Sequence, residues 1–478
     1  MMLAKKAGQR RNICQSDLQG SSVSGDSLIA ALELELGSRL ILPGTSDYEK
    51  ARQVWNGMHD RRPLLIARCL TTADVSLVVR QAVAVGLPVT VRGGGHNVAG
   101  LAIDDDAVLI DLSLMRAVSV DPVGRQADAE GGCLLGDLDA ATVPHGLACP
   151  TGVVSETGLG GLALGGGYGW LAQKWGLTCD HIVAAEVVLA DGSVVDATEH
   201  QHPDLLWALR GGGGNFGIVT QFTLRLRPVE SVQYHTRAYS LDAATAVLAA
   251  YRAYAGQQPR DLHTVAAMKY TSGSDEPLLV ISAAWFGDPE MGASAVAPLC
   301  GGVPPVLAAT RMIGYLELQG LGDHGEPKGN RYFTKSCYLD DLPDEVTGEI
   351  IRTARDMPSR LSSIDFEYLG GAIEDISDAD SAFPRRAAPY IYTVSAQWCD
   401  ASQDDENIAW TRRGVDRVRD FQYGGVYVNY LQGESGVKAP EIYGAERYRR
   451  LGAIKDRYDP DNVLRGHQNI RPTSGRRE

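Results

Sequence analysis

The sequence lacks an excess of positive charge and lacks long apolar runs. Its 478 residues carry 45 lysines and arginines against 59 aspartates and glutamates, so the formal net charge is -14. This balance argues against nucleic-acid binding, because phosphate contacts rely on a basic surface. No stretch reaches the roughly 18 apolar residues that a membrane-spanning helix needs. We therefore expect no nucleic-acid partner and no membrane segment.

The eight cysteines also lack the spacing of a metal site. None stands in a C-x-x-C pair or at zinc-ligand spacing to histidines. We therefore expect no metal and mostly buried free thiols, which are typical of a reducing compartment. The Arg10-Arg11 pair lacks the apolar segment of a secretion signal. Residues 1–40 are predicted to be an N-terminal extension, and the protein to be cytoplasmic.

Glycine, by contrast, is abundant at 54 residues and is concentrated in three clusters. These clusters occupy residues 93–95, 158–169 and 211–217. Backbone N–H groups in glycine-rich turns form concavities that bind anions, and glycine lets a ligand approach the main chain closely. Three clusters far apart in the sequence predict one large ligand, with a pyrophosphate, held from several sides.

One of these clusters contains a dinucleotide fingerprint. Gly158, Gly160 and Ala163 match G-x-G-x-x-A, and Asp180 lies near the spacing of a ribose-binding acid. That motif needs a preceding strand and a following helix within one βαβ unit. The residues before it contain a proline and a glycine, and the residues after it are mostly glycine, so neither flank fits. The sequence disfavours a nicotinamide site.

The pattern of elements changes near Pro228. Before it, two strand-like runs flank a helical segment at 72–86, which predicts a βαβ-like beginning. After it, helical and strand-like segments alternate with fewer glycines. From about residue 431 the composition changes again, toward a helix that ends at Asp459-Pro460. The chain is therefore predicted to have two main domains and a distinct C-terminal segment.

His96 follows three glycines directly after a strand-like run. A lone histidine is often structural, with its ring nitrogens satisfied by hydrogen bonds. Imidazole has an ordinary pKa of about 6.5, however, so it is mostly neutral and nucleophilic near neutral pH. His96 is therefore a candidate for a covalent link to an electrophilic cofactor.

Five ordered segments of the chain resemble the berberine-bridge-enzyme-like oxidases, which have the vanillyl-alcohol-oxidase and p-cresol-methylhydroxylase flavoprotein fold. The segments are PVTVRGGGHNVAG (88–100), TGLGGLALGGGYG (157–169), HPDLLWALRGGGGNFGIVT (202–220), YVNY (427–430) and RYDPDNVLRGHQNIRP (457–472). The resemblance covers nearly everything from about residue 45 to residue 472. Several ordered motifs are far more specific than any one of them.

The resemblance implies an α+β fold with a split FAD-binding domain of the p-cresol-methylhydroxylase type, residues 41–228 and 431–478. Inserted between them would be a substrate-binding domain, residues 229–430, built on an antiparallel sheet backed by helices. His96 would be joined to the 8α-methyl carbon of the isoalloxazine. The other implied cofactor-binding residues are Arg92, Gly93, Gly94, Gly95, Asn97, Thr157, Gly158, Gly160, Gly161, Gly167, Tyr168, Gly217, Val219, Tyr427, Asn429 and Asn469.

Many relatives add a second link, from a cysteine thiol to carbon 6 of the flavin. That cysteine lies at a fixed interval before the last glycine of the GGGYG-like turn. Counted back from Gly169, the same interval reaches Val154, and Cys149 lies five residues too early. We expect a single link through His96, with Cys149 a free thiol near the flavin loop.

The resemblance implies an oxidase that removes a hydride from a small organic substrate to flavin N5 and passes the electrons to O₂, releasing H₂O₂. The substrate would be an alcohol, a sugar or a secondary metabolite. A dehydrogenase that uses another acceptor, or a flavin-binding protein without turnover, remains an alternative. Gly-x-Ser-x-Gly does not occur, which argues against a hydrolase with a nucleophile elbow.

Three residues are candidates for the base. The resemblance implies Tyr430, at the end of YVNY. A tyrosine pKa of about 10 would have to fall by about 3 units, so we expect a cation or hydrogen bonds nearby. In plant relatives a glutamate follows an FPHR-like motif; here the motif is FPRR (383–386) and the matching residue is Tyr392. Glu367 is the third candidate.

Overall fold

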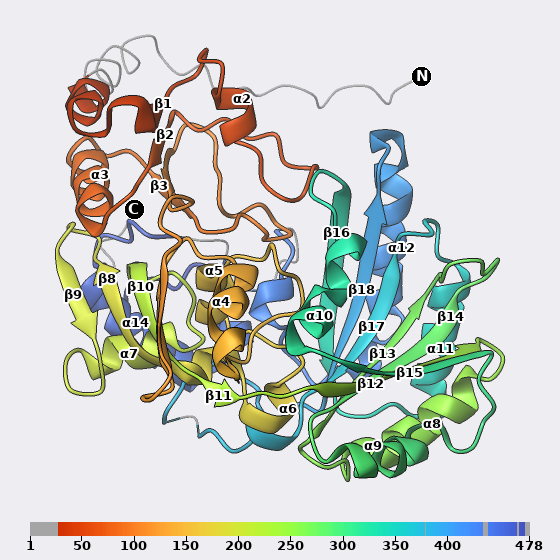
Figure 1. Cartoon of the computed structure of the whole chain (residues 1–478). Helices are drawn as coiled ribbons and strands as arrows, with labels where there is room; N and C mark the ends of the chain where they lie inside the picture. Colours follow the sequence, from red (N-terminus) through yellow and green to blue (C-terminus); the bar gives the residue numbers. More distant parts are fainter. Residues whose placement is uncertain (1–26, 378, 434–437, 466–467, 474–478) are drawn as a thin grey trace, which may run out of the picture.

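The computed structural model describes residues 27–377, 379–433, 438–465 and 468–473, so most of the predicted N-terminal extension lies outside the described residues. The chain forms two halves side by side (Figure 1). One half contains sheets of four, five and two strands, and the other contains a seven-stranded sheet.

The four-stranded sheet begins the first half. Its order is β1 (Leu40–Ile41), β2 (Leu65–Arg68), β4 (Val108–Asp111) and β3 (Val89–Arg92). Strands β2 and β3 both pair in parallel with β4. Parallel strands need a crossover connection, and α3 (Thr72–Ala84) joins β2 to β3 on the two sides of β4, in the βαβ-like arrangement that the sequence predicts. The α3 helix starts with a capping box between Thr71 and Asp74.

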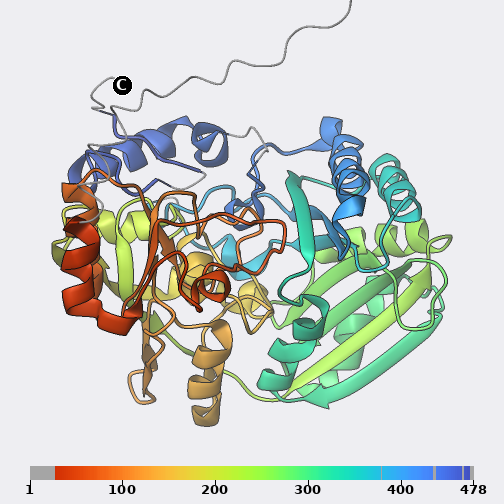
Figure 2. The same ribbon diagram turned by 90° about the horizontal axis from the view of Figure 1, so that it is seen from above.

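The five-stranded sheet is antiparallel and carries the main core of this half. Its order is β5 (Val118–Asp121), β6 (Gln126–Glu130), β10 (Ile218–Arg225), β8 (Ile182–Val188) and β9 (Val194–Ala197). Its buried face packs with α5 (Leu159–Leu164), α7 (Pro203–Leu209) and α14 (Ala445–Tyr458) in one apolar cluster. The C-terminal helix α14 thus returns to the first half, which Figure 2 shows from above.

The seven-stranded sheet is antiparallel throughout. Its order is β15 (Leu307–Ile313), β12 (Val232–Ser240), β14 (Leu278–Trp285), β13 (Leu262–Lys269), β17 (Ser363–Tyr368), β18 (Tyr390–Trp398) and β16 (Arg331–Leu339). One face packs against α8 (Ala244–Ala255), α11 (Asp344–Arg355) and α12 (Asp404–Asp416). The α+β class and the antiparallel sheet backed by helices are therefore confirmed.

The other named α-helices and strands are short. They are α2 (Tyr48–Ala51), α4 (Leu135–Thr142), β7 (Leu147–Ala148), α6 (Ala172–Trp175), β11 (Arg227–Pro228), α9 (Pro289–Val296), α10 (Tyr315–Gln319) and α13 (Ala439–Tyr443). Among the described helices, none has the length and apolar character to cross a membrane.

Candidate active site

A cavity of about 960 Å³ is lined by the glycine-rich loops of the first half and by the face of the seven-stranded sheet opposite the helices. Cofactor and ligand sites commonly measure roughly 300–1,000 Å³, so the cavity suits a large ligand. The sequence-predicted residues that line it are Gly93, Gly94, Gly95, His96, Asn97, Thr157, Gly158, Gly160, Gly161, Tyr168, Gly217, Val219, Glu367, Tyr427, Asn429 and Tyr430.

Two of the glycine clusters touch backbone to backbone at one wall of the cavity. A Cβ on Gly94 would lie 2.4 Å from the nitrogen of Gly158, and a Cβ on Gly158 would lie 2.3 Å from the nitrogen of Gly94. No side chain fits at either position without a backbone shift. The absence of side chains leaves bare main chain beside the cavity, which is what a bound pyrophosphate or ring system requires.

The His96 imidazole lines the same cavity. Burial lowers its pKa to about 4, so the ring is neutral near neutral pH. Its Nε2 is buried and has no hydrogen-bond partner among the described residues. The ring stacks on the indole of Trp55, with centroids 4.2 Å apart and planes 19° apart. A neutral imidazole with a free nitrogen in a glycine-lined cavity fits a covalently attached flavin.

The YVNY segment interlocks with the glycine-rich turn at 165–169, so two distant motifs form one wall. The Tyr427 hydroxyl accepts hydrogen bonds from the Gly167 backbone N–H at 2.8 Å and from the Asn429 Nδ2 at 3.0 Å. The Asn429 amide also donates to the Leu162 carbonyl at 3.1 Å. A Cβ on Gly165 would meet the Asn429 side-chain oxygen at 2.0 Å. Glycine at 165 is therefore required for this contact.

Tyr430 and Glu367 form a pair in the lining of the cavity, where Glu367 comes from strand β17 of the seven-stranded sheet. The Tyr430 hydroxyl donates to Glu367 Oε1 at 3.0 Å. Burial, and next the charge of Asp365, raises the pKa of Glu367 to about 8. Burial, and next the charge of Glu367, raises the pKa of Tyr430 well above its usual value. The expected cation or hydrogen bonds that would lower the pKa of Tyr430 are not found among the described partners of its hydroxyl, which donates to a carboxyl group instead. The lowered pKa expected from the sequence is therefore wrong.

The Tyr392 side chain lies on the other face of the sheet, which corrects its expected role as a base. Its ring is fully buried in the apolar cluster under the helices, and its hydroxyl donates to the Gly414 carbonyl of α12 at 3.2 Å. Side chains alternate along a strand, so Thr393 lines the cavity in its place.

Three further predicted residues do not line the cavity. Arg92 is held in a buried ion pair with Asp111, its partner in the β3–β4 register, at 2.6 Å. Gly167 donates its N–H to Tyr427, as described above, accepts from Thr178 at its carbonyl, and has a positive φ of 84°. Asn469 lies beside the lining residue Gln468, and its Oδ1 is buried without a partner among the described residues.

Cys149 is fully buried within the first-half core and is absent from the cavity lining. Burial raises the pKa of its thiol, which keeps it protonated. Val154, the residue at the interval of the second link, does line the cavity. The side chain at that place thus has no thiol to offer a flavin.

Asp180, the acid of the dinucleotide fingerprint, forms a buried ion pair with Arg386 at 2.5 Å. Both side chains are almost completely inaccessible to solvent. Neither residue lines the cavity, so Asp180 has a structural role as the partner of Arg386. The geometry agrees with the sequence in disfavouring a nicotinamide site.

Sequence reasoning missed most of the polar wall that the seven-stranded sheet contributes to the cavity. Along β13, β17 and β18 this wall carries Lys269, Ser363, Asp365, Thr393, Ser395 and Gln397. Glu326, from the loop before β16, also lines the cavity, and burial raises its pKa to about 7. The alternation of each strand places these residues on one face, but the sequence contains no signal that says which face meets the cofactor.

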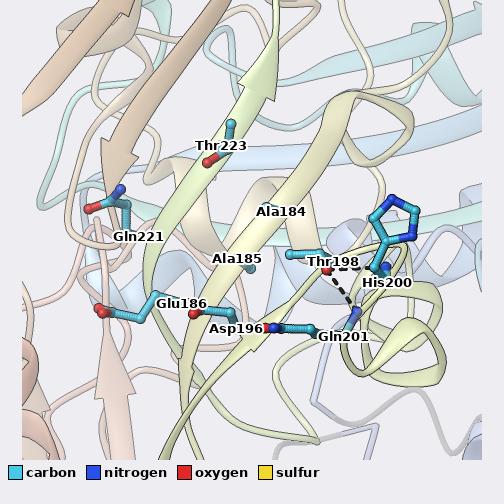
Figure 3. Close-up of a pocket in the computed structure, with 9 residues that line it drawn as sticks. All are labelled: Ala184, Ala185, Glu186, Asp196, Thr198, His200, Gln201, Gln221 and Thr223. Atoms are coloured by element: carbon cyan, nitrogen blue, oxygen red, sulfur yellow. Dashed lines mark hydrogen bonds between the residues drawn. The ribbon is translucent and has the colours of Figure 1, made fainter.

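A second depression, of about 430 Å³, lies on the five-stranded sheet (Figure 3). Gln221 and Thr223 line it and alternate with the core residues Phe222 and Leu224, so it lies on the face away from the core. None of the glycine clusters reaches it. No group of three potential metal ligands occurs in the described parts of the chain. The larger cavity is therefore the candidate active site.

Comparison with known proteins agrees with this geometry. Residues 63–198 match the family described as FAD binding domain, and residues 426–471 match the family described as berberine and berberine like. An FAD-linked oxidoreductase of Dictyostelium discoideum is 30% identical over 433 residues, which cover 90% of this chain and 93% of that protein.

Two other proteins are similar over most of their length. The (R)-6-hydroxynicotine oxidase of Paenarthrobacter nicotinovorans is 29% identical over 92% of this chain and 98% of its own. A glucooligosaccharide oxidase of Acremonium strictum, described with 6-S-cysteinyl, 8α-N1-histidyl FAD, superposes with a TM-score of 0.83. It covers 93% of this chain and 99% of its own at 22% identity, and so shows the fold alone. The chain belongs to the berberine-bridge-enzyme-like family of FAD-linked oxidoreductases.

Proposed function

We propose that this FAD-linked oxidoreductase holds its FAD covalently through His96 alone and oxidises a small alcohol, sugar or secondary metabolite, with O₂ as the final acceptor. The neutral His96 ring with its unpartnered Nε2 supports the link, and Val154 at the second-link position supports its being single. The bound flavin would supply the hydride acceptor.

The observation that carries the mechanism is the hydrogen bond from Tyr430 to Glu367. We propose that the Tyr430 oxygen accepts the proton of the substrate O–H while its own proton passes to Glu367 Oε1. The proton then resides on a carboxyl group whose pKa of about 8 suits an acceptor near neutral pH. This relay needs no free phenolate, so the raised pKa of Tyr430 does not oppose it.

We further propose the domain division 41–228 with 431–478, and 229–430. The support is that all seven strands of the substrate-facing sheet lie between Val232 and Trp398, whereas α14 packs with the first half. A cytoplasmic location is proposed because the seven described cysteines are all free thiols.

The test combines two measurements on the purified full-length protein. Acid precipitation should leave the yellow colour in the pellet, and His96→Ala should release it to the supernatant. A substrate panel of alcohols, sugars and hydroxylated aromatics should then yield H₂O₂ under air. Covalent flavin with substrate-dependent reduction but no reoxidation by air would make the protein a dehydrogenase. Complete release of flavin from the wild-type pellet would reject the His96 link.

A further inference from the structure

The Trp55 indole ring is enclosed between two other rings. His96 stacks on it with centroids 4.2 Å apart, and Tyr332 stacks on it with centroids 3.7 Å apart and planes 21° apart. Both distances are too short for the two rings to share one face of the indole, so they occupy opposite faces. His96 belongs to the glycine-rich loop after β3, and Tyr332 belongs to β16 of the seven-stranded sheet. The stack therefore joins the two halves of the molecule at the proposed attachment residue.

Hydrogen bonds from its backbone and from its indole ring fix Trp55 to both halves. Its backbone N–H donates to the Gly95 carbonyl at 3.0 Å, immediately before His96. Its carbonyl accepts from the Gly329 N–H at 2.9 Å, and its indole Nε1 donates to the Glu326 carbonyl at 2.9 Å. Trp55 is 7% exposed, so the ring has little freedom to move.

The neighbouring Asn56 reinforces the same junction. Its Nδ2 donates to the Val98 carbonyl at 2.7 Å and to the Tyr332 carbonyl at 2.9 Å. Its Oδ1 accepts from the Tyr332 N–H at 3.1 Å. One fully buried amide thus ties the segment after His96 to the strand that carries Tyr332.

The His96 ring itself has few other restraints. Its flanking Gly95 has a positive φ of 68°, and Nε2 has no partner among the described residues. We propose that Trp55, braced by Tyr332, is a positioning residue that orients the His96 imidazole for covalent attachment of FAD. The formation of the link would therefore depend on a residue of the opposite half. This inference rests on the proposed His96 link.

Attachment would oxidise the 8α-methyl group and reduce the flavin by one electron pair. A bond forms between an imidazole nitrogen and the 8α-methyl carbon, and one C–H and one N–H bond break. The electron pair passes into the ring system of the flavin, which takes up two protons. O₂ would then take up the electron pair and the two protons, yielding H₂O₂ and the oxidised, linked cofactor. Because this step joins two groups held by the same chain, its rate depends strongly on their mutual orientation.

The experiment measures the attachment rate, not the turnover. Full-length protein produced under riboflavin limitation is mixed with FAD, and acid-resistant flavin is followed by its fluorescence in denaturing gels. Trp55→Leu keeps an apolar side chain without a stacking ring and should slow attachment by about tenfold or more. Trp55→Phe keeps a ring but loses the Nε1 hydrogen bond, and should stay within about threefold of wild type. Tyr332→Leu should fall between them.

Trp410→Leu is the matched control, because it removes a buried indole from the cluster on the helix side of the sheet. Its attachment rate per FAD-binding chain should equal that of wild type. Attachment by Trp55→Leu at the wild-type rate would overturn the inference. If Trp55→Leu does not fold, Trp55→Phe and Tyr332→Leu decide, and equal rates for both would also overturn it. A wild-type chain that never retains flavin would instead reject the His96 link itself.

Discussion

The hydroxyl of Tyr430 donates its hydrogen bond to Glu367 Oε1, across 3.0 Å, from the segment after α12 to strand β17. The hydroxyl proton is therefore directed at the carboxyl group, and the lone pairs of the oxygen remain available to a substrate. The ring of Tyr430 is held at 81° to that of Tyr427, with centroids 4.8 Å apart, and Tyr427 is itself bound to the glycine-rich turn. The proposed catalytic pair and the proposed cofactor-binding wall are thus connected through Tyr427.

We predict that Tyr430→Phe and Glu367→Gln each slow flavin reduction by about 100-fold, because each interrupts the same proton transfer. The double variant should be about as slow as either single variant, since residues that act as a unit are not additive. Anaerobic stopped-flow spectroscopy of the flavin absorbance measures the rate. Tyr392→Phe is the control, because its hydroxyl binds Gly414 on the far face. Independent, multiplying effects of the first two substitutions would contradict a shared relay.

The rate of flavin reduction should rise with pH and level off above about 8, the pKa to which burial and Asp365 raise Glu367. The rate rises with pH because only the ionised carboxylate of Glu367 can accept the proton in the proposed relay. Glu367→Gln should flatten this profile as well as lower it. A wild-type rate that falls through the same interval would show that the protonated carboxyl group is the active form.

The raised pKa of Glu367 also predicts that the unfolding free energy changes with pH. Because the folded pKa of Glu367 exceeds its unfolded value, its contribution is fully present below about pH 4.5 and is lost as pH rises through about 8. Glu367→Gln cannot ionise, so its unfolding free energy relative to wild type should increase from pH 5 to pH 9. Denaturant titrations at matched ionic strength and flavin occupancy measure the difference. A constant difference over this interval would contradict the raised pKa.

The close contact between the Gly94 and Gly158 backbones allows a steric test of FAD binding. Gly94→Ala places a Cβ against the Gly158 backbone, where no flexible side chain can yield, so we expect FAD binding to weaken by at least about tenfold. Gly348→Ala is the control, because Gly348 is solvent-exposed in the middle of α11 and a Cβ there would meet nothing within 4 Å. That substitution should leave FAD binding unchanged and stabilise the protein by about 0.5–1 kcal/mol. Isothermal titration with FAD in a His96→Ala background separates binding from attachment.

The glycine-rich walls of the cavity could be predicted because glycine clusters are local patterns with a direct physical meaning, whereas YVNY was expected from the family resemblance. Their roles in binding FAD stay predictions. Gly94, Gly158 and Asn429 act through contacts that only small or amide side chains permit, so their identity carries the signal. The α3 helix was predictable for the same reason, since its cap and periodicity are local.

The base could not be settled from the sequence, because the face of a strand depends on register. A shift of one residue moves a side chain to the opposite face, and Tyr392 and Thr393 differ by that shift. The Tyr430–Glu367 pair joins positions 63 residues apart, and Trp55 meets Tyr332 across an even larger separation. Such contacts come from tertiary packing and leave no local pattern.

A buried ion pair between Lys455 and Asp459 holds the C-terminal segment in place. Lys455 and Asp459 are both completely buried, and the Lys455 Nζ also donates to the carbonyls of Asn215 and Leu464 at 2.6 Å. Lys455→Met removes the cation and leaves a buried carboxylate uncompensated, so we expect a loss of about 3–5 kcal/mol in unfolding free energy. Since Asn215 lines the cavity, FAD binding should weaken too. Arg457→Ala is the control, because Arg457 lies on the same helix, α14, as Lys455 but forms an exposed ion pair with Asp204 of α7. It should lower the unfolding free energy by less than about 1 kcal/mol and leave FAD binding unchanged. Chemical denaturation and FAD titration measure both effects, and equal losses for the two variants would show that the buried pair has no special role in anchoring the segment.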